Sequence, residues 1–254
     1  MTEFEGKVTL VTGGASGIGR ATALAFAQQG AQVVIADLSD ENGLAVVAEI
    51  EAAGGRAIFV KTDVTSQAQT TAMVVAAVDT FGKLDCAVNS AGIVGPVAPI
   101  TSYALEEWNR IIAINLTGVF LAMQSEIQQM EQQGHGGSIV NVASAMGLVG
   151  YGNLSGYTAG KHGVVGLTRD VALEVASKGI RVNCICPPST RTPMYMEFSG
   201  GSTEVEQMLV KANHPIGRIA EPADMADAIV LLSSDRARFV VGEALQANGG
   251  WTIQ

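Results

Sequence analysis

The sequence has few of the residues that hold small secreted or metal-binding proteins together. Its 254 residues include three cysteines, Cys86, Cys184 and Cys186, and three histidines. The cysteines lie in apolar stretches, and an odd, sparse count does not suit a disulfide framework. We therefore expect free core thiols in a reducing compartment, the cytoplasm. The histidines are scattered and the cysteines lack metal-ligand spacing, so the sequence predicts no metal site.

Long hydrophobic runs and an excess of basic residues are also missing. No run reaches the roughly 18 apolar residues that a membrane helix needs, and residues 1–7 show no apolar signal-peptide segment. Fifteen lysines and arginines stand against 24 aspartates and glutamates, which gives a net charge of −9. An acidic surface repels phosphate backbones and anionic lipid, so we expect no nucleic acid and no membrane as partners.

What the sequence does have is seven short segments that are almost continuously hydrophobic, as strands buried on both faces of a parallel sheet are. They are residues 7–12, 32–37, 57–62, 84–89, 138–143, 180–187 and 243–247. Helical patterns occupy 18–29, 40–53, 66–81, 105–132, 156–178 and 222–233. This alternation predicts an α/β fold, a Rossmann-type doubly wound parallel sheet of about seven strands with helices on both faces.

One segment breaks the alternation. Residues 188–218 are irregular, with Gly200-Gly201 in the middle and a short helical pattern near 203–212. Irregular insertions of this length in a compact domain are usually functional lids. Because no linker, repeat or low-complexity tract interrupts the chain, we expect a single nucleotide-binding domain over 1–254 with a substrate lid at about 188–218.

The first predicted strand runs into the glycine-rich segment 12–19, with Gly13, Gly17 and Gly19 around Ser16 and Ile18. Glycines let the chain turn sharply and approach a pyrophosphate, and the helix that follows points its N-terminus at the phosphates. A plain strand-to-helix turn would also use glycine. The position between the first strand and a helix favours the dinucleotide-binding interpretation.

Polar side chains end the next three strands. Asp37 can accept hydrogen bonds from ribose hydroxyls and would repel a 2′-phosphate, and its neighbours carry no cation, so the sequence favours NAD over NADP. Asp63 could meet polar atoms of adenine. Asn89, which begins the turn 89–92, could contact the cofactor or could instead join neighbouring strands by a structural hydrogen bond.

A possible catalytic group follows the fifth strand. Tyr157 and Lys161 are four residues apart at the start of a helix and therefore share a face. A nearby ammonium stabilises a phenolate, so we expect Lys161 to lower the pKa of Tyr157 toward the working pH. Ser144 could hydrogen-bond a substrate oxygen with which Tyr157 exchanges a proton. Taken alone, such a Tyr–Lys pair is also a common surface arrangement.

These motifs, in this order, resemble the short-chain dehydrogenase/reductase family in its compact single-domain branch. The resemblance covers roughly residues 5–252 and rests on the segment 12–19, Asp63-Val64, the turn 89–92, Asn115, Ser144 and Tyr157-x-x-x-Lys161. It implies an NAD(P)-dependent alcohol dehydrogenase or ketoreductase that moves a hydride between the cofactor and a secondary alcohol or ketone.

The resemblance also implies roles for particular residues. Tyr157 would be the general acid/base, Ser144 would orient the substrate oxygen, Lys161 would assist Tyr157 and bind the nicotinamide ribose, and Asn115 would hold a water beside Lys161. Cofactor contacts are expected at Gly13, Ser16, Gly17, Ile18, Gly19, Asp37, Asp63, Val64, Asn89, Ala91, Gly92, Tyr157, Lys161, Pro187, Thr190 and Thr192. Substrate contacts are expected at Ser144, Met146 and Tyr157.

The chain departs from the family at one point. Relatives usually have Pro-Gly after the sixth strand, where this chain has Pro187-Pro188. Proline fixes φ and has no N–H to donate, so nicotinamide binding or lid closure could differ here. Arg191 beyond it could bind a cofactor phosphate, grip a substrate carboxylate or simply be solvated.

The residues expected to form the pocket walls are mostly apolar: 94–97, 145, 146, 149–154, 188, 194–196 and 198. They favour a neutral, fairly hydrophobic small alcohol or ketone. The nearest alternative is an NADPH-dependent 3-oxoacyl-[acyl-carrier-protein] reductase, with His135 and Lys178 near the carrier-docking region, but the acidic charge and Asp37 disfavour it. A sugar-nucleotide epimerase relative fits the short chain poorly, and a non-catalytic scaffold would not need the Tyr–Lys pair.

Two long helices, 105–132 and 156–178, carry more apolar residues than one sheet face needs. In the family these helices pair between subunits and the C-terminal tail, here 249–254, forms a second interface. We therefore expect a symmetric homotetramer.

Overall fold

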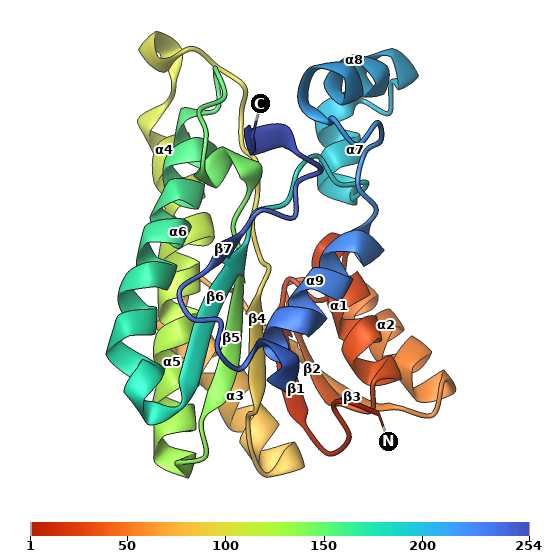
Figure 1. Cartoon of the computed structure of the whole chain (residues 1–254), viewed down its shortest axis with the longest axis vertical. Coiled ribbons are helices and arrows are strands. Elements are labelled where there is room, and N and C mark those ends of the chain that lie inside the picture. Colours follow the sequence, from red (N-terminus) through yellow and green to blue (C-terminus); the bar gives the residue numbers. More distant parts are fainter. Residues whose placement is uncertain (1, 254) are drawn as a thin grey trace.

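The alternating strand and helix patterns form one parallel sheet in the computed structural model, which describes residues 2–253 (Figure 1). Its strands are β1 Val8–Thr12, β2 Gln32–Asp37, β3 Arg56–Lys61, β4 Cys86–Asn89, β5 Gly137–Val142, β6 Ile180–Ile185 and β7 Ala244–Leu245. Within the described chain they pair in the order β3-β2-β1-β4-β5-β6-β7, every pair parallel. The predicted doubly wound sheet is confirmed.

Helices cover both faces of this sheet (Figure 1). One face carries α1 Gly17–Gln28, α2 Asp40–Ala52 and α9 Pro222–Ser233, and the other carries α3 Gln67–Phe81, α4 Leu105–Ile112, α5 Gly118–Gln133 and α6 Ser155–Val175. Strand side chains alternate between two cores. Leu10 and Ile139 point toward α5 and α6, whereas Ile35 packs with Phe26 of α1.

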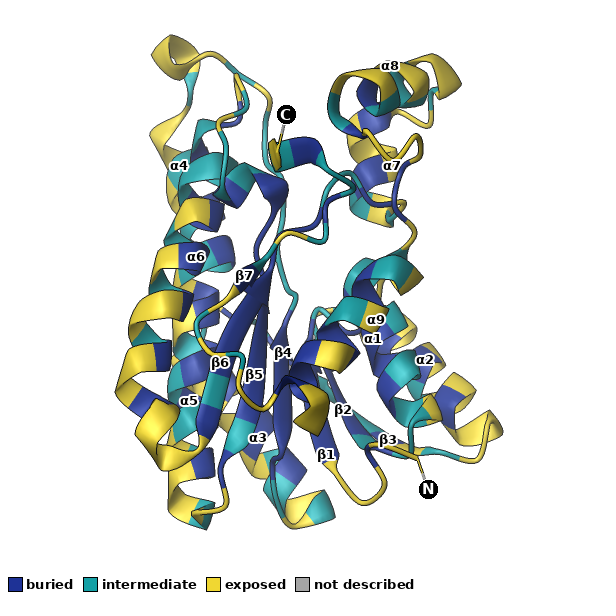
Figure 2. Ribbon diagram, in the orientation of Figure 1, coloured by how far each residue is buried: buried dark blue, intermediate teal, exposed yellow. Residues whose placement is uncertain are grey.

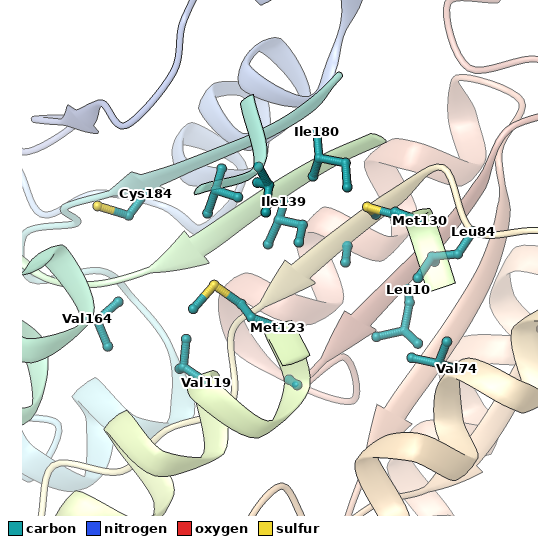
Figure 3. Packing of buried hydrophobic residues seen from close by; sticks show 14 of the residues in the cluster. Leu10, Val74, Leu84, Val119, Met123, Met130, Ile139, Val164, Ile180 and Cys184 are labelled. Carbon is teal, nitrogen blue, oxygen red and sulfur yellow. The ribbon is translucent and has the colours of Figure 1, made fainter. Parts of the chain in front are cut away.

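Burial follows from this layering. The strands are buried along almost their whole length, while the outer helix surfaces are exposed (Figure 2). On the α5 side, Leu10, Ile139 and Ile180 of the sheet belong to one apolar cluster with Val119 and Met123 of α5 (Figure 3). Fully burying such side chains contributes about 1.5–3 kcal/mol each, which makes the sheet a stable platform for the loops at its edge.

The strand order reverses between β1 and β4, because β1 pairs with β2 on one side and with β4 on the other. The connections leaving these strands run to opposite faces and open a crevice at the carboxyl edge of the sheet. Asp37 ends β2 and Asn89 ends β4, in register with Thr12 of β1. The residues singled out in the sequence therefore meet at one edge.

The predicted sixth strand, 180–187, is too long. The chain continues beside β5 as far as Pro187, whose carbonyl accepts a hydrogen bond from the Ala145 N–H at 2.7 Å. Regular pairing nevertheless stops at Ile185, since Pro187 and Pro188 have no N–H to donate. The last strand is likewise shorter than the predicted 243–247.

The predicted helix 105–132 is continuous but not uniform. Between α4 and α5 the segment Ala113–Thr117 forms a π-helical turn, a feature that often marks functional sites. Among the described residues Leu105–Gln133 is the helix long and apolar enough to cross a membrane by length and composition. Here it packs against α3, α6 and the sheet as a core helix.

The predicted lid contains two helices, α7 Pro193–Ser199 and α8 Thr203–Asn213. The sequence indicated only the second of them. Thr192 caps α7 by accepting a hydrogen bond from the Tyr195 N–H at 3.2 Å, and Pro193 occupies its first turn. This cap and proline explain why a helix begins there. Both helices rise above the carboxyl edge of the sheet (Figure 1).

Candidate active site

A cavity of about 630 Å³ opens at the carboxyl edge, between the sheet and the lid. Its walls come from the β1–α1 turn, the ends of β2 to β6, the start of α6, the lid and the C-terminal turn. The volume lies within the ordinary range for small-molecule sites. This one cavity therefore brings together residues from most of the predicted motifs.

The glycine-rich turn forms one end of the cavity. Gly13 has a φ of +65°, and a Cβ there would lie 2.8 Å from the Ala91 nitrogen. A Cβ at Gly19 would overlap the carbonyl oxygen of Gly13. In the described structure Ser16 makes no side-chain cap to α1, and the first turn of α1 has no acidic residue. The helix N-terminus can therefore offer its N–H groups to an anion.

Asp37 lies in the cavity wall beside this turn. Its Oδ2 accepts from the Ala15 N–H at 3.1 Å and its Oδ1 from the Ser39 N–H at 3.0 Å. The nearby cation Lys61 pairs with Asp40 at 2.6 Å, and among the described residues no cation pairs with Asp37. Its negative charge is therefore not neutralised at this end of the cavity.

The polar residues at the other two strand ends, Asp63 after β3 and Asn89 of β4, differ in whether they line the cavity. Asp63 lines the cavity with Val64, but its Oδ1 already accepts from the Thr65 N–H at 2.9 Å and from the Thr65 hydroxyl at 2.7 Å. Asn89 is buried outside the lining, and its Nδ2 donates to Asn141 of β5 at 3.0 Å. Of the two interpretations left open for Asn89, this position favours the structural one.

Three of the four expected catalytic residues converge on the middle of the cavity. Tyr157 and Lys161 lie on the first two turns of α6, and Ser144 follows β5. Lys161 Nζ donates to the Val142 carbonyl at 2.8 Å and lies 5.7 Å from the centre of the Tyr157 ring. Ser144 bonds the Tyr157 hydroxyl. A hydroxyl and a phenol thus meet beside a buried ammonium.

Asn115 sits in the π-helical turn and does not line the cavity directly. Its Oδ1 accepts from the Ile93 N–H at 2.9 Å and its Nδ2 donates to the Ile93 carbonyl at 2.8 Å. A Cβ at Gly92 would lie 3.1 Å from Asn115 Oδ1 and 3.5 Å from Lys161 Nζ. Both polar atoms therefore border the same small space next to Gly92.

One expectation about this group is wrong. We expected Lys161 to lower the pKa of Tyr157, but burial raises that pKa, and the hydrogen bond from Ser144 only partly opposes the rise. The ammonium lies over the ring face and not at the hydroxyl. Burial also lowers the pKa of Lys161, to about 8. The direction of the Tyr157 pKa shift is therefore set by burial against the hydrogen bond from Ser144, without a contribution from Lys161.

The remaining wall of the cavity is mostly apolar, with Arg110 as a charged exception. It includes Ile93, Val94, Met146, Leu154, Pro188, Met194, Tyr195, Phe198 and Trp251. Thr190 and Thr192 also line it, together with Pro187. Apolar walls around a polar centre suit a substrate with one reacting oxygen on a hydrophobic body.

Arg191 does not belong to this wall. Its guanidinium binds both carboxylate oxygens of Glu206 on α8, at 2.9 and 2.8 Å, and Glu221 before α9 at 3.0 Å. None of the three roles considered from the sequence describes this arrangement. Arg191 holds the second lid helix to the body of the domain, which leaves it engaged with two carboxylates.

Trp251 is a wall residue that the sequence analysis missed, as it missed Ile93, Arg110 and Ile114. It is buried in the C-terminal turn, packs edge-on against Tyr151 at 6.1 Å and contacts the His214 ring at 5.7 Å. Asn248 shapes this turn by donating to the Thr252 hydroxyl at 2.7 Å. We expected the tail 249–254 at a subunit interface; Gln254 lies outside the described residues. No local sequence signal connects Trp251 with a pocket so far away in the chain.

The chain was compared with known proteins. A family model described as enoyl-(acyl carrier protein) reductase matches residues 13–252. A cyclohexanol dehydrogenase from Acinetobacter sp. strain SE19 is 44% identical over 98% of this chain and 96% of its own. A cis-4-hydroxycyclohexanecarboxylate dehydrogenase from Sinomonas cyclohexanicum is 43% identical over 98% of both chains.

Solved structures show the same similarity in three dimensions. The crystal structure of levodione reductase superimposes with a TM-score of 0.95 and 37% sequence identity, covering 98% of this chain and 99% of that one. The likeness therefore includes the whole sheet, its helices and the lid.

Proposed function

Because the chain belongs to the short-chain dehydrogenase/reductase family, we propose that it uses NAD to oxidise a neutral alicyclic secondary alcohol to its ketone, and to reduce that ketone. It is an oxidoreductase that acts on CH–OH groups of small molecules. The observation that carries the proposal is one cavity in which Ser144, Tyr157 and Lys161 lie between a phosphate-binding turn and apolar walls.

The residues present fit a dinucleotide. A Cβ at Gly13 or Gly19 would clash with the protein's own backbone, so these glycines allow the tight turn and close packing that bring the N-terminus of α1 to the cavity. We propose that this turn and the N-terminus of α1 bind the phosphates, Asp37 the adenosine ribose, and Lys161 the nicotinamide ribose. When bound, NAD supplies the hydride acceptor, or as NADH the hydride donor.

The chain's own polar residues would handle the proton. Ser144 would hydrogen-bond the substrate oxygen and hold it near the Tyr157 hydroxyl. Because its pKa is raised, Tyr157 is protonated at neutral pH and can donate a proton to a ketone oxygen during reduction. During oxidation the Tyr157 hydroxyl would first pass its proton to a water in the space beside Lys161, and the phenolate oxygen would then take the proton of the alcohol. We propose that Asn115, fixed to Ile93, keeps the space beside Lys161 open for a water.

We propose NAD in preference to NADP because of the unneutralised charge at Asp37. A 2′-phosphate carries about −1.5 to −2 charge near pH 7, and a carboxylate in the same wall repels it. Lys61 and Arg20, the neighbouring cations, are already paired with Asp40 and Glu49.

The names of the relatives support the alicyclic substrate. Cyclohexanol dehydrogenase and cis-4-hydroxycyclohexanecarboxylate dehydrogenase both act on a hydroxyl borne by a six-membered ring. The ring walls of Tyr195, Phe198 and Trp251 in this chain offer apolar surface for such a body. The description of the family model names an acyl-carrier-protein reductase, but Lys178, expected near a docking site for the carrier, pairs with Glu131 at 2.5 Å.

We also propose a homotetramer. Apolar side chains stay exposed along the outer helices, among them Leu105 at 72%, Phe120 at 44% and Leu173 at 83%. A shallow groove between α5 and α6 is lined by Leu116, Phe120 and Leu167. Self-association would cover this surface. Light scattering that shows a monomer at assay concentration would contradict the proposal.

The test of the function is NADH formation at 340 nm with NAD⁺ and a panel of alcohols. We expect cyclohexanol and neutral substituted cyclohexanols to be turned over better than linear secondary alcohols or charged analogues. Activity confined to charged alcohols, or only with NADP⁺, would refute the proposal.

A further inference from the structure

A carboxyl group lies in the core directly behind the active site. Glu126 of α5 has an exposed fraction of 0%. Its Oε2 accepts from Asn89 Nδ2 at 3.1 Å, and the same nitrogen donates to Asn141 Oδ1 at 3.0 Å. Asn141 Nδ2 in turn donates to the Thr168 hydroxyl of α6 at 2.9 Å. A polar chain thus crosses the apolar core from α5 through β4 and β5 to α6.

Two atoms of this chain lack a partner among the described residues: Glu126 Oε1 and Asn89 Oδ1. Both belong to the side chains that the Nδ2–Oε2 bond already joins. Both hydrogens of Asn89 Nδ2 are used, one on Glu126 and one on Asn141. An ionised carboxylate would therefore leave two buried acceptors unsatisfied, which costs about 1–3 kcal/mol for each neutral group and more for a charge.

A single proton removes this conflict. We propose that Glu126 is protonated in the folded protein and that its Oε1–H donates to Asn89 Oδ1, closing a two-hydrogen-bond acid–amide pair that positions the turn after β4. In this pair the carboxamide donates through Nδ2 and accepts through Oδ1, while the carboxyl does the reverse. No buried acceptor of either side chain is then left without a donor.

The surroundings favour the neutral acid. Burial raises the pKa of Glu126 to about 8, against a smaller lowering by the Asn89 hydrogen bond, and no charged neighbour contributes. The side chains that meet it are amides from β4 and β5. The titratable residues on the elements packed around it include Cys86 on β4, Asp79 on α3, Lys161 on α6 and Glu131 on α5, and none of them forms a hydrogen bond or ion pair with this carboxyl among the described contacts.

The pair acts on the site through Asn89. This residue ends β4 and is followed by Ser90 and Ala91, which line the cavity. The N–H groups of Ser90 and Ala91 donate to the Thr12 hydroxyl at 3.2 and 3.4 Å, so the turn rests on the end of β1 where the glycine-rich turn begins. Glu126 is therefore a positioning residue for the cofactor end of the cavity. This last step rests on the proposed function, whereas the protonation does not.

The test uses Glu126→Gln, which can form the same two hydrogen bonds without a titratable proton. Glu131→Gln, an exposed residue on the same helix, is the control. Infrared spectra at pH 7 should show the carbonyl band of a protonated carboxylic acid in wild type and in Glu131→Gln. The band should be absent from Glu126→Gln. A wild-type spectrum without it would overturn the proposal.

Stability gives a second, independent readout. Since the folded protein holds a proton that the unfolded chain loses near pH 4–5, wild-type stability should fall as pH rises from about 5 through 8. The melting temperature of wild type should therefore drop relative to that of Glu126→Gln between pH 6 and 9. Above pH 9 the two curves of melting temperature against pH should run parallel. Parallel curves over the whole range would contradict a protonated Glu126.

Cofactor binding separates the positioning role from the function. By fluorescence titration, the NADH dissociation constant of Glu126→Gln should stay within about twofold of wild type. In Glu126→Leu, which removes both hydrogen bonds between residue 126 and Asn89, it should rise roughly 5-fold or more. An unchanged constant in Glu126→Leu would refute the positioning role. Failure of every variant and of wild type to bind NADH would instead refute the proposed function and leave the infrared result standing.

Discussion

Replacing Asp37 by asparagine tests the cofactor preference with a change of charge and almost no change of shape. The carboxylate accepts from the Ala15 and Ser39 N–H groups, and an asparagine oxygen can keep one of these bonds. The variant should fold, with a loss near 1 kcal/mol. For a chain of this size that corresponds to roughly 2–4 °C in melting temperature.

The effect on the two cofactors should be opposite. Asp37 is half-buried in an open wall, so a water-like dielectric applies, in which unit charges about 4 Å apart interact by about 1 kcal/mol. A 2′-phosphate of charge −1.5 to −2 would then bind about 10- to 30-fold more tightly to Asp37→Asn. Exchanging a charged acceptor for a neutral one on the ribose hydroxyls costs NAD about 1 kcal/mol, or roughly fivefold.

The dissociation constants of NADH and NADPH, measured by fluorescence titration, give the result directly. Their ratio should shift on the order of 100-fold toward NADPH in Asp37→Asn. Glu41→Gln removes an exposed carboxylate in the first turn of α2, and its ratio should change little. An unchanged ratio in Asp37→Asn, or equal shifts in both variants, would refute the assignment of Asp37 to cofactor selection.

Three further substitutions test other parts of the site. Tyr157→Phe should lower kcat by at least 100-fold, because the proton donor is lost, while the NADH dissociation constant stays within about twofold; retained turnover would contradict its role. Trp251→Ala should raise KM for cyclohexanol roughly tenfold, since apolar contact is worth about 1–2 kcal/mol, and an unaltered KM would show that the ring does not touch substrate. Gly19→Ala should abolish NADH binding and lower the melting temperature, because its Cβ would overlap the Gly13 carbonyl; wild-type binding would show that the turn can yield.

Much of this architecture could be predicted because its causes are local. Continuous apolar runs predict strands buried on both faces, and their alternation with helices leaves one sheet topology that places strand ends together. Gly13, Asp37, Ser144 and Tyr157 were therefore predicted to lie at one edge, and all four line one cavity. The C-terminal end of β6 was less predictable. Pro187 still lies beside β5, although the regular hydrogen bonding between the two strands has already stopped.

The features that the sequence did not predict depend on contacts between segments far apart in the chain. Trp251 reaches the cavity because the C-terminal turn folds back beside Tyr151 and His214, and no pattern within the tail indicates that path. The pKa of Tyr157 is another case. The i, i+4 spacing correctly brings Lys161 near the ring, but spacing says nothing about desolvation, and desolvation decides the direction of the shift.

Glu126 and Asn89 form a pair in the folded protein, and the role of neither residue could be predicted from the sequence alone. At 3.6 residues per turn, Glu126 lies about three turns after Asn115 and so shares the inward face of the helix, yet a glutamate there ordinarily indicates an exposed position. Asn89 was left between a cofactor contact and a structural bond. Once folding places them side by side, 37 residues apart in the chain, a buried acid without a cation needs a partner that can both donate and accept. A carboxamide is such a partner, and this accounts for an asparagine at the inner end of β4 as well as for the acid on α5.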